Sequence, residues 1–173
     1  AQGPVIVAID CSGSMSGEPD TWSKACALAM YSIARKQRRD FSVLLFDTQV
    51  VQEVFIKKGE HKPADLIHIL TAGTGGGTDF ETPLNRAMEL ISADDHNKAD
   101  LIFITDGICD ISQAFQIQYH AQKKMRAFST YTILIGGNTN EKTLAKKFSD
   151  SVTMLCDMIN QNESEAFSIC FNI

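Results

Sequence analysis

The chain has 173 residues, the size of one ordinary domain, with 44% hydrophobic and 21% charged residues. A globular chain of this length buries roughly 70% of its unfolded surface, so it needs no disulfide or metal in order to fold. The formal net charge of −5 argues against a nucleic-acid binder, because neutralising phosphates requires a basic face. No apolar run approaches the ~20 residues that a membrane-spanning helix needs.

The cysteines point to a reducing compartment. The chain has five of them, an odd number, widely spaced and without a C-x-x-C pair. This pattern favours a cytoplasmic protein with small buried thiols over a disulfide framework. The sequence shows no signal peptide and enters strand-like sequence at Val5 without an initiator methionine. We therefore expect residues 1–173 to form a single domain that belongs to a longer protein.

Hydrophobic patterning predicts a strand and then a helix at the start of the chain. Val5 to Ile9 is continuously apolar and ends in Asp10, as expected for a central parallel strand buried on both faces. A basic run at residues 35–39 should close the following helix and complement its dipole. Apolar residues recur at helical spacing before this run: Trp22, Ala25, Cys26, Ala29, Met30, Ile33 and Ala34.

The next two strands are predicted at residues 41–46 and 50–56, and only three residues separate them. Such a short connection cannot hold a helical crossover, so these strands should form an antiparallel hairpin. A short helix is expected over residues 62–70, with Pro63 in its first turn.

The second half of the chain continues the alternation of strands and helices. A glycine-rich loop at residues 73–79 precedes a helix that begins near Thr82, and Asn140 is expected to cap a later helix. The further predicted elements are strands at 101–105, 130–135 and 152–155, and helices at 112–127, 141–148 and 163–171. This order predicts an α/β fold: a doubly wound, Rossmann-like, mostly parallel six-stranded sheet with one antiparallel edge strand and helices on both faces.

Three polar clusters fall where such a sheet binds ligands, beyond the carboxyl ends of its strands. They are the sequences DCSGS at 10–14, TD at 78–79 and TDG at 105–107. The clusters offer hydroxyl and carboxylate oxygens, without histidine or paired thiolates, which suits Mg²⁺, Mn²⁺ or Ca²⁺ rather than zinc. A cation held by weak hydroxyl ligands keeps much of its positive charge, so it would attract a carboxylate from a partner.

These clusters resemble the metal-ion-dependent adhesion site of von Willebrand factor A-type (vWA) domains, written D-x-S-x-S…T…D. Asp10, Ser12, Ser14, Thr78 and Asp106 match its five positions in order. The resemblance covers essentially the whole chain and implies a non-catalytic, metal-dependent protein-interaction module. It implies that Ser12 and Ser14 bind the metal through their hydroxyls and that Thr78 binds it directly or through water. Asp10 and Asp106 would hold metal-bound waters, and a partner's acidic side chain would take the remaining position.

The opening sequence GPVIVAIDCSGSM and the helix after GGTD are similar to those of intracellular bacterial vWA proteins. They look most like the C-terminal vWA domains of proteins that work with MoxR-class AAA+ ATPases. The resemblance therefore implies an adaptor for such an ATPase.

The same residues are compatible with other kinds of site. The glycine-rich loop lacks the Lys-Ser/Thr ending of a P-loop, and Asp79 is better placed to cap the next helix than to bind metal. A Mg²⁺-dependent phosphohydrolase of related fold would use Asp10 as its nucleophile, but Ser12 stands where that chemistry needs a general acid. A vWA domain that never loads metal would instead be a scaffold, and the sequence leaves this alternative open.

Overall fold

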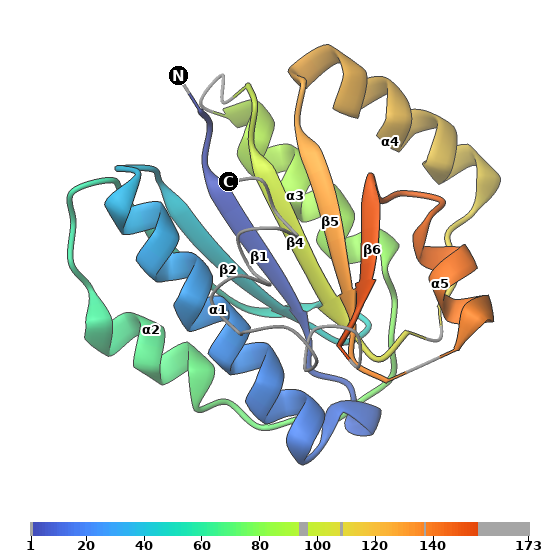
Figure 1. Ribbon diagram of the computed structural model, residues 1–173, viewed down its shortest axis with the longest axis horizontal. Helices are drawn as coiled ribbons and strands as arrows, with labels where there is room; N and C mark the ends of the chain where they lie inside the picture. The colour runs from blue at the N-terminus through green and yellow to red at the C-terminus, as the bar shows by residue number, and fades with distance from the viewer. Residues whose placement is uncertain (1, 94–96, 108, 137, 156–173) are drawn as a thin grey trace.

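The computed structural model describes residues 2–93, 97–107, 109–136 and 138–155 (Figure 1). The helix predicted over residues 163–171 lies outside this part of the chain. Within the described part, none of the helices combines the length and the apolar character required to cross a membrane.

Six strands form one sheet in the order β3-β2-β1-β4-β5-β6. All neighbouring strands run parallel except β2 and β3, which pair antiparallel. The predicted hairpin and the predicted antiparallel edge strand are therefore confirmed. The strands are β1 (Val5–Asp10), β2 (Phe41–Phe46), β3 (Val50–Ile56), β4 (Asp100–Thr105), β5 (Ser129–Leu134) and β6 (Ser151–Met154).

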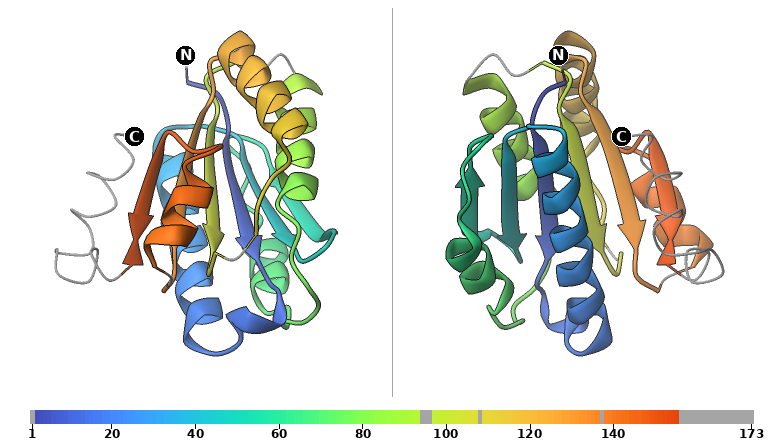
Figure 2. Two further views of the ribbon diagram at one scale, coloured as in Figure 1. Left: turned by 90° about the vertical axis from the view of Figure 1, so that its right-hand side faces the viewer. Right: turned by 60° about the vertical axis from the view of Figure 1, so that its left-hand side comes forward.

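Helices cover both faces of this sheet, as Figures 1 and 2 show. Buried residues of α1 and α2 pack on one face, and those of α3, α4 and α5 pack on the other. The predicted doubly wound α/β fold is thus confirmed. The helices are α1 (Glu18–Lys36), α2 (Pro63–Leu70), α3 (Glu81–Ala93), α4 (Gln113–Arg126) and α5 (Thr139–Ala145), and a short 3₁₀ helix, η1 (Gly13–Met15), precedes α1.

The central strand β1 explains why its sequence is apolar without alternation. Val7 and Ile9 enter the core beneath α1, while Ile6 and Ala8 enter the core beneath α3. Successive side chains of a strand point to opposite faces, so a strand covered on both sides buries every residue. Each aliphatic side chain of Val or Ile size buried in this way contributes about 1.5–3 kcal/mol.

The buried face of α1 differs from the predicted one by part of a turn. Ala25 is exposed, whereas Ala27 and Tyr31 are buried. The Tyr31 ring lies 5.3 Å from that of Phe41 at the start of β2. The helix is apolar around more than half of its circumference, so contacts with the sheet decide which residues are buried, and periodicity alone could not.

The start of α5 also corrects the prediction. The capping residue is Asn138 rather than Asn140, because the Asn138 side chain accepts a hydrogen bond from the Asn140 backbone amide at 2.8 Å. The Glu141 carboxylate in turn accepts a hydrogen bond from the Asn138 amide. This reciprocal capping box satisfies amides at both positions, which a cap at Asn140 would not do.

The basic residues at 35–39, which span the end of α1, have two roles rather than the single one predicted. Residues 35 and 36 lie in the last helical turn, as expected. Arg39, however, is buried and its guanidinium contacts the Asp100 carboxylate at 2.5 Å. It also donates hydrogen bonds to the carbonyls of Gly3 (2.5 Å) and Pro4 (3.2 Å). Arg39 therefore joins the amino ends of β1, β2 and β4.

Candidate metal centre

The candidate site lies at the carboxyl ends of β1 and β4. The chain passes from β1 to β2 on one side and returns to β4 on the other, so the strand order reverses between β1 and β4. Ligands of doubly wound sheets bind at this reversal. Asp10 is the last residue of β1, and Asp106 directly follows the last residue of β4, Thr105.

Asp10 is fully buried, and both of its carboxylate oxygens accept hydrogen bonds. One oxygen, Oδ1, accepts from the Ser12 amide at 2.9 Å, and Oδ2 accepts from the Thr105 hydroxyl at 2.6 Å. Burial raises the pKa of Asp10, the bonds from Thr105 and Ser12 oppose that rise, and the charge of Asp106 adds to it. A cation beside this carboxylate would favour its ionised form.

Ser12 and Ser14 present their hydroxyls to the same place. Their Oγ atoms lie 3.2 Å apart, in the 3₁₀ turn that follows β1. Two oxygens that bind one Mg²⁺ at ~2.1 Å and at right angles would lie roughly 3.0 Å apart, so the pair fits adjacent positions around an octahedral ion. The buried side chain of Met15 anchors the turn to the core, which holds this pair in place.

Hydrogen bonds hold the glycine-rich loop against the turn after β1. The Gly75 amide donates to the Cys11 carbonyl at 2.9 Å, and the Gly13 amide donates to the Gly76 carbonyl at 3.2 Å. Gly76 has a φ of +81°, and a Cβ there would lie 2.7 Å from Asp47 Oδ2, so only glycine fits. The loop thereby lies beside the two serines.

The same loop carries Thr78, the fourth candidate ligand, to the neighbourhood of the site. Thr78 is half-buried, and its carbonyl faces the Cys109 thiol at 3.8 Å. Within the described residues, no hydrogen bond joins the Thr78 hydroxyl to Asp10, Ser12, Ser14 or Asp106. The structure thus links Asp10 to Ser12 and Ser12 to Ser14 by hydrogen bonds, and it brings the Thr78 backbone close to Cys109.

Asp79 caps α3, as the sequence predicted. Its Oδ1 accepts a hydrogen bond from the Glu81 amide at 3.0 Å, and its Oδ2 accepts one from the Thr82 hydroxyl at 2.6 Å. Its own amide donates to the Asp47 carbonyl at 2.9 Å. Both carboxylate oxygens therefore serve the start of the helix.

Thr105 has a role that the sequence prediction missed. Its buried hydroxyl donates to Asp10 and also accepts a hydrogen bond from the Gly107 amide at 3.1 Å. One hydroxyl therefore fixes the Asp10 carboxylate and the backbone on either side of Asp106. The available signal was a hydroxyl residue in the last position of an otherwise apolar strand.

The thiols near the site are protonated. Burial raises the pKa of Cys11 to about 11, and the negative charges of Asp47, Asp10 and Asp20 raise it further. Burial likewise raises the pKa of Cys109. Neutral thiols are poor metal ligands and poor nucleophiles. Among the described residues, no three His, Cys, Asp or Glu side chains gather in a way that could hold a metal ion. A metal here would therefore depend mainly on hydroxyl ligands.

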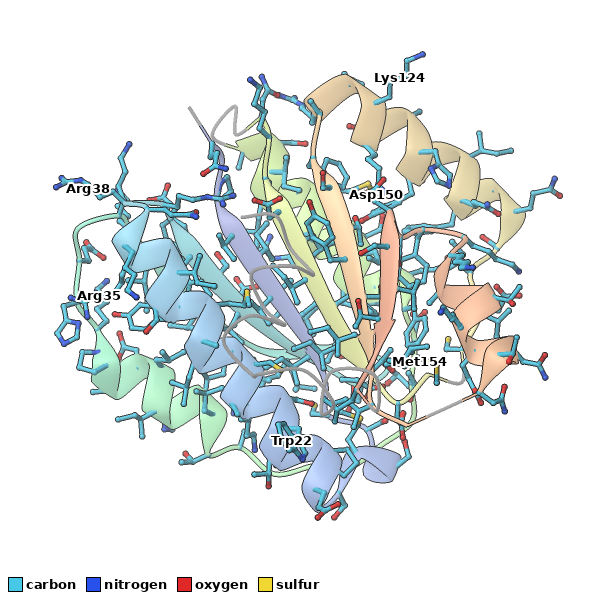
Figure 3. The ribbon with its side chains drawn as sticks, viewed as in Figure 1. Trp22, Arg35, Arg38, Lys124, Asp150 and Met154 are labelled. Atoms are coloured by element: carbon cyan, nitrogen blue, oxygen red, sulfur yellow. The ribbon has the colours of Figure 1, made fainter. Side chains whose placement is uncertain are left out.

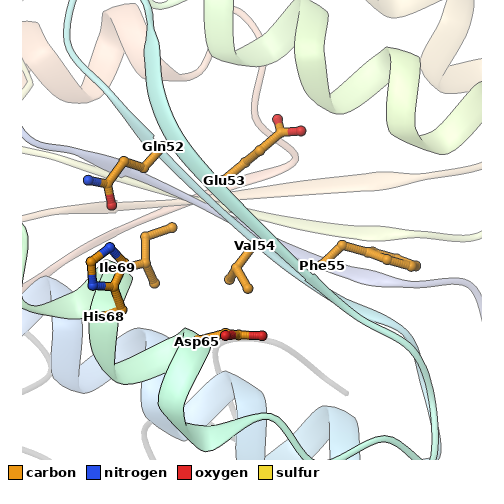
Figure 4. Close-up of a pocket in the computed structure, with 7 residues that line it drawn as sticks. All are labelled: Gln52, Glu53, Val54, Phe55, Asp65, His68 and Ile69. Carbon is orange, nitrogen blue, oxygen red and sulfur yellow. The ribbon is translucent and has the colours of Figure 1, made fainter.

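A separate groove of about 550 Å³ runs between the edge strand β3 and α2 (Figure 4). Its lining mixes apolar and polar side chains: Gln52, Glu53, Val54, Phe55, Asp65, His68 and Ile69. The Glu53 carboxylate already forms two hydrogen bonds with the Arg86 guanidinium, at 2.7 and 2.8 Å. None of the motif residues lines this groove.

The chain belongs to the von Willebrand factor type A domain family. The family model matches residues 5–108, a range that includes all five candidate ligands. vWA domains are a metal-dependent protein-interaction fold.

Known proteins resemble the chain over most of its length. MJ0811, an uncharacterized protein of Methanocaldococcus jannaschii, is 32% identical over 167 residues, which cover 96% of this chain and 38% of the relative. The VWA domain of SpRpn10 superposes with a TM-score of 0.65 at 11% identity, covering 94% of this chain and 96% of that one. Proximal thread matrix protein 1 of the mussel byssus, with a zinc-occupied MIDAS motif, superposes with a TM-score of 0.62 at 16% identity, covering 98% of this chain and 48% of that one. At these identities the two structures show the fold alone.

Proposed function

We propose that this domain binds one divalent cation at the carboxyl end of its sheet and uses the cation to hold an acidic side chain of a partner protein. The carrying observation is the pair of hydroxyls of Ser12 and Ser14, 3.2 Å apart, beside the buried carboxylate of Asp10. Hydroxyl and carboxylate oxygens favour a hard cation, so we propose Mg²⁺, with Mn²⁺ or Ca²⁺ as substitutes.

The chain's residues divide into two roles in this proposal. Ser12, Ser14 and Thr78 would contact the ion through their hydroxyls. Asp10 and Asp106 would accept hydrogen bonds from water molecules on the ion rather than bind it directly, since each Asp10 oxygen has one protein donor and one lone pair left for water. A mussel protein of the same fold has a zinc-occupied MIDAS motif, which supports the proposal that a domain of this fold can hold a divalent cation.

The proposed partner is a MoxR-class AAA+ ATPase in the cytoplasm, with this domain as its adaptor. The support is the resemblance of the opening sequence and of the helix after GGTD to vWA domains that work with such ATPases. The chain spans about two fifths of the length of its relative MJ0811. The activity of any longer protein that contains this domain is therefore a proposal too.

The alternative of a Mg²⁺-dependent phosphohydrolase gains no support from the site. A nucleophilic Asp10 would need an accessible oxygen, yet this residue is fully buried and both of its oxygens accept hydrogen bonds. Ser12 also supplies no proton donor of suitable acidity. We therefore propose a binding module rather than an enzyme.

The test is calorimetric titration of Mg²⁺ and Mn²⁺ into the metal-stripped domain, beside a Ser12→Ala/Ser14→Ala variant. The expected result is saturable binding at one site, with an affinity at least about 100-fold lower in the variant. Ser16→Ala is the matched control, because Ser16 is an exposed serine of the same turn outside the motif. Equal metal binding by the double variant and the parent chain would refute the proposal.

A further inference from the structure

The loops that surround the candidate metal centre are acidic and contain no lysine or arginine. These segments, which include η1 and the first turn of α1, are residues 11–20, 47–49, 71–80, 106–107 and 109–112, and hydrogen bonds or shared strand ends place them together at the carboxyl edge of the sheet. Their acidic residues are Glu18, Asp20, Asp47, Asp79, Asp106 and Asp110. We call this set the acidic rim.

The lysines closest to the acidic rim are already engaged. The Lys24 ammonium contacts the Asp20 carboxylate at 2.7 Å and donates to the Ala72 carbonyl at 2.7 Å. The Lys147 ammonium contacts both carboxylate oxygens of Asp110, at 2.7 and 2.8 Å. Within the described residues, the carboxylates of Asp47 and Asp79 accept hydrogen bonds from neutral amides and hydroxyls and form no ion pair with a lysine or arginine.

Exposed basic residues gather at the opposite end of the molecule. Figure 3 shows Arg38 and Lys124 toward the end of the fold away from Trp22, which lies near the start of α1, and Arg35 on the flank between them and Trp22. Lys36, Lys57 and Lys58 are also exposed in segments at that end. These exposed cations lie away from the acidic rim, and we call their end of the molecule the basic end.

This separation of charge bears on which carboxylate can reach the metal. An acidic side chain that approaches the ion passes within about a Debye length, ~8–10 Å, of several fixed negative charges. These charges repel an isolated acidic peptide, but they attract lysines and arginines beside the entering carboxylate. Basic residues around the partner's carboxylate also speed association, because attraction between opposite charges steers the diffusing partner toward the site.

We propose that the partner presents its metal-binding carboxylate within a basic surface, so that its lysine or arginine side chains face the acidic rim while the carboxylate reaches the ion. This inference rests on the proposed function, and it specifies the partner of the same site. The proposed partner is a protein segment in which basic residues flank one acidic residue, and it is not a segment rich in acidic residues.

The test compares labelled peptides on the Mg²⁺-loaded domain by fluorescence anisotropy and by chemical-shift titration. One peptide has a central aspartate flanked by lysines, the second has the same aspartate flanked by serines, and the third has asparagine flanked by lysines. We expect the first to bind about tenfold or more tightly than either of the others at ~50 mM salt, and the advantage to shrink in ~500 mM salt. Removing Mg²⁺ should abolish the difference between the aspartate and asparagine peptides.

Two double variants locate the effect on the protein. Glu18→Gln/Asp47→Asn should reduce the preference for lysine flanks several-fold, and the second substitution keeps a side-chain oxygen that can accept from the Gln49 amide. Lys57→Gln/Lys58→Gln, at the basic end, is the matched control and should leave the preference unchanged.

The outcomes separate this inference from the proposed function. Equal affinity for the two aspartate peptides, a preference for serine flanks, or no peptide binding by a domain that calorimetry shows to hold Mg²⁺ would overturn the inference alone. Absence of metal binding by the parent domain would overturn the proposed function and the inference with it.

Discussion

Each end of the sheet contains a buried charged side chain, but only the one at the amino end has an ion-pair partner among the described residues. At the amino end, the Arg39 guanidinium pairs with Asp100 and satisfies the carbonyls of Gly3 and Pro4. At the carboxyl end, the equally buried Asp10 has amide and hydroxyl partners but, within the described residues, no ion-pair partner. The buried charge at the amino end is balanced by a partner within the chain, whereas the buried carboxylate at the carboxyl end is one that an added cation would balance.

The largest expected effect comes from breaking the amino end. Arg39→Met leaves the Asp100 carboxylate without its cation and two strand-end carbonyls without donors. Loss of one partner of a buried ion pair costs about 3–5 kcal/mol in the free energy of unfolding. Urea denaturation measures this loss, and Lys36→Met, at an exposed position of the same turn region, serves as the control. Mg²⁺ affinity should stay unchanged, because the pair lies at the far end of the sheet.

If Arg39→Met destabilised the protein no more than Lys36→Met did, the amino end would not depend on this pair. If it weakened Mg²⁺ binding strongly while the domain stayed folded, the two ends would be coupled and the contrast between them would fail.

A smaller effect is expected from Thr105→Val at the carboxyl end. The substitution keeps the shape of the side chain but removes the donor to Asp10 Oδ2 and the acceptor for the Gly107 amide. Leaving buried polar groups without partners costs about 1–3 kcal/mol. Unlike the Arg39 variant, it should also weaken Mg²⁺ binding, and Thr105→Ser should restore both properties. A Val variant with parental stability and metal affinity would contradict the role assigned to this hydroxyl.

The smallest effect concerns an exposed ion pair near the candidate site. The hydrogen bond from Lys147 lowers the pKa of Asp110, and the Ile111 amide lowers it further. A lowered folded-state pKa stabilises the protein above the unfolded value of about 4, and this contribution disappears as the pH falls through the folded value. Because the pair is half exposed, its contribution should stay below about 0.5 kcal/mol.

Asp110→Asn tests this expectation, since asparagine keeps an oxygen for the Ile111 amide. The variant should be slightly less stable than the parent in urea at pH 7, and the gap should close near pH 2, about two units below the unfolded carboxylate value. A stability difference of several kcal/mol between the variant and the parent at pH 7 would contradict the small contribution expected of an exposed ion pair. The Lys147–Asp110 pair would then resemble the buried pair at Arg39.

Local patterns in the sequence predicted most of the fold. A short connection between two apolar runs specified the β2–β3 hairpin, and continuous apolar character specified that β1 is buried on both faces. The partner of Arg39 could not be predicted in this way, because Asp100 lies 61 positions away in sequence and pairs with it only through the sheet order. The buried face of α1 was also beyond periodicity, since apolar residues surround much of that helix.

The candidate site was predicted in its residues but not in its internal bonds. The spacing of Asp10, Ser12 and Ser14 placed three oxygen donors on one turn, and the structure holds the first two and the last two in direct contact. A hydroxyl residue at the end of an apolar strand marked Thr105 as unusual, but the sequence did not indicate that it would connect Asp10 to the next loop. That contact exists only because β1 and β4 are neighbours, which the chain order alone leaves undetermined. The metal itself remains a prediction.

The close packing of Gly3 has a practical consequence for handling the domain. A Cβ at this residue would clash with the Asn97 carbonyl oxygen, so the backbone just before β1 packs closely against the chain that leads into β4. This segment lies at the end of β1 opposite its Asp10 tip, as the label N in Figure 2 shows. A biotin or a surface tether attached ahead of Gly3 would therefore lie at the far end of β1 from the candidate metal centre and leave that centre open to analyte.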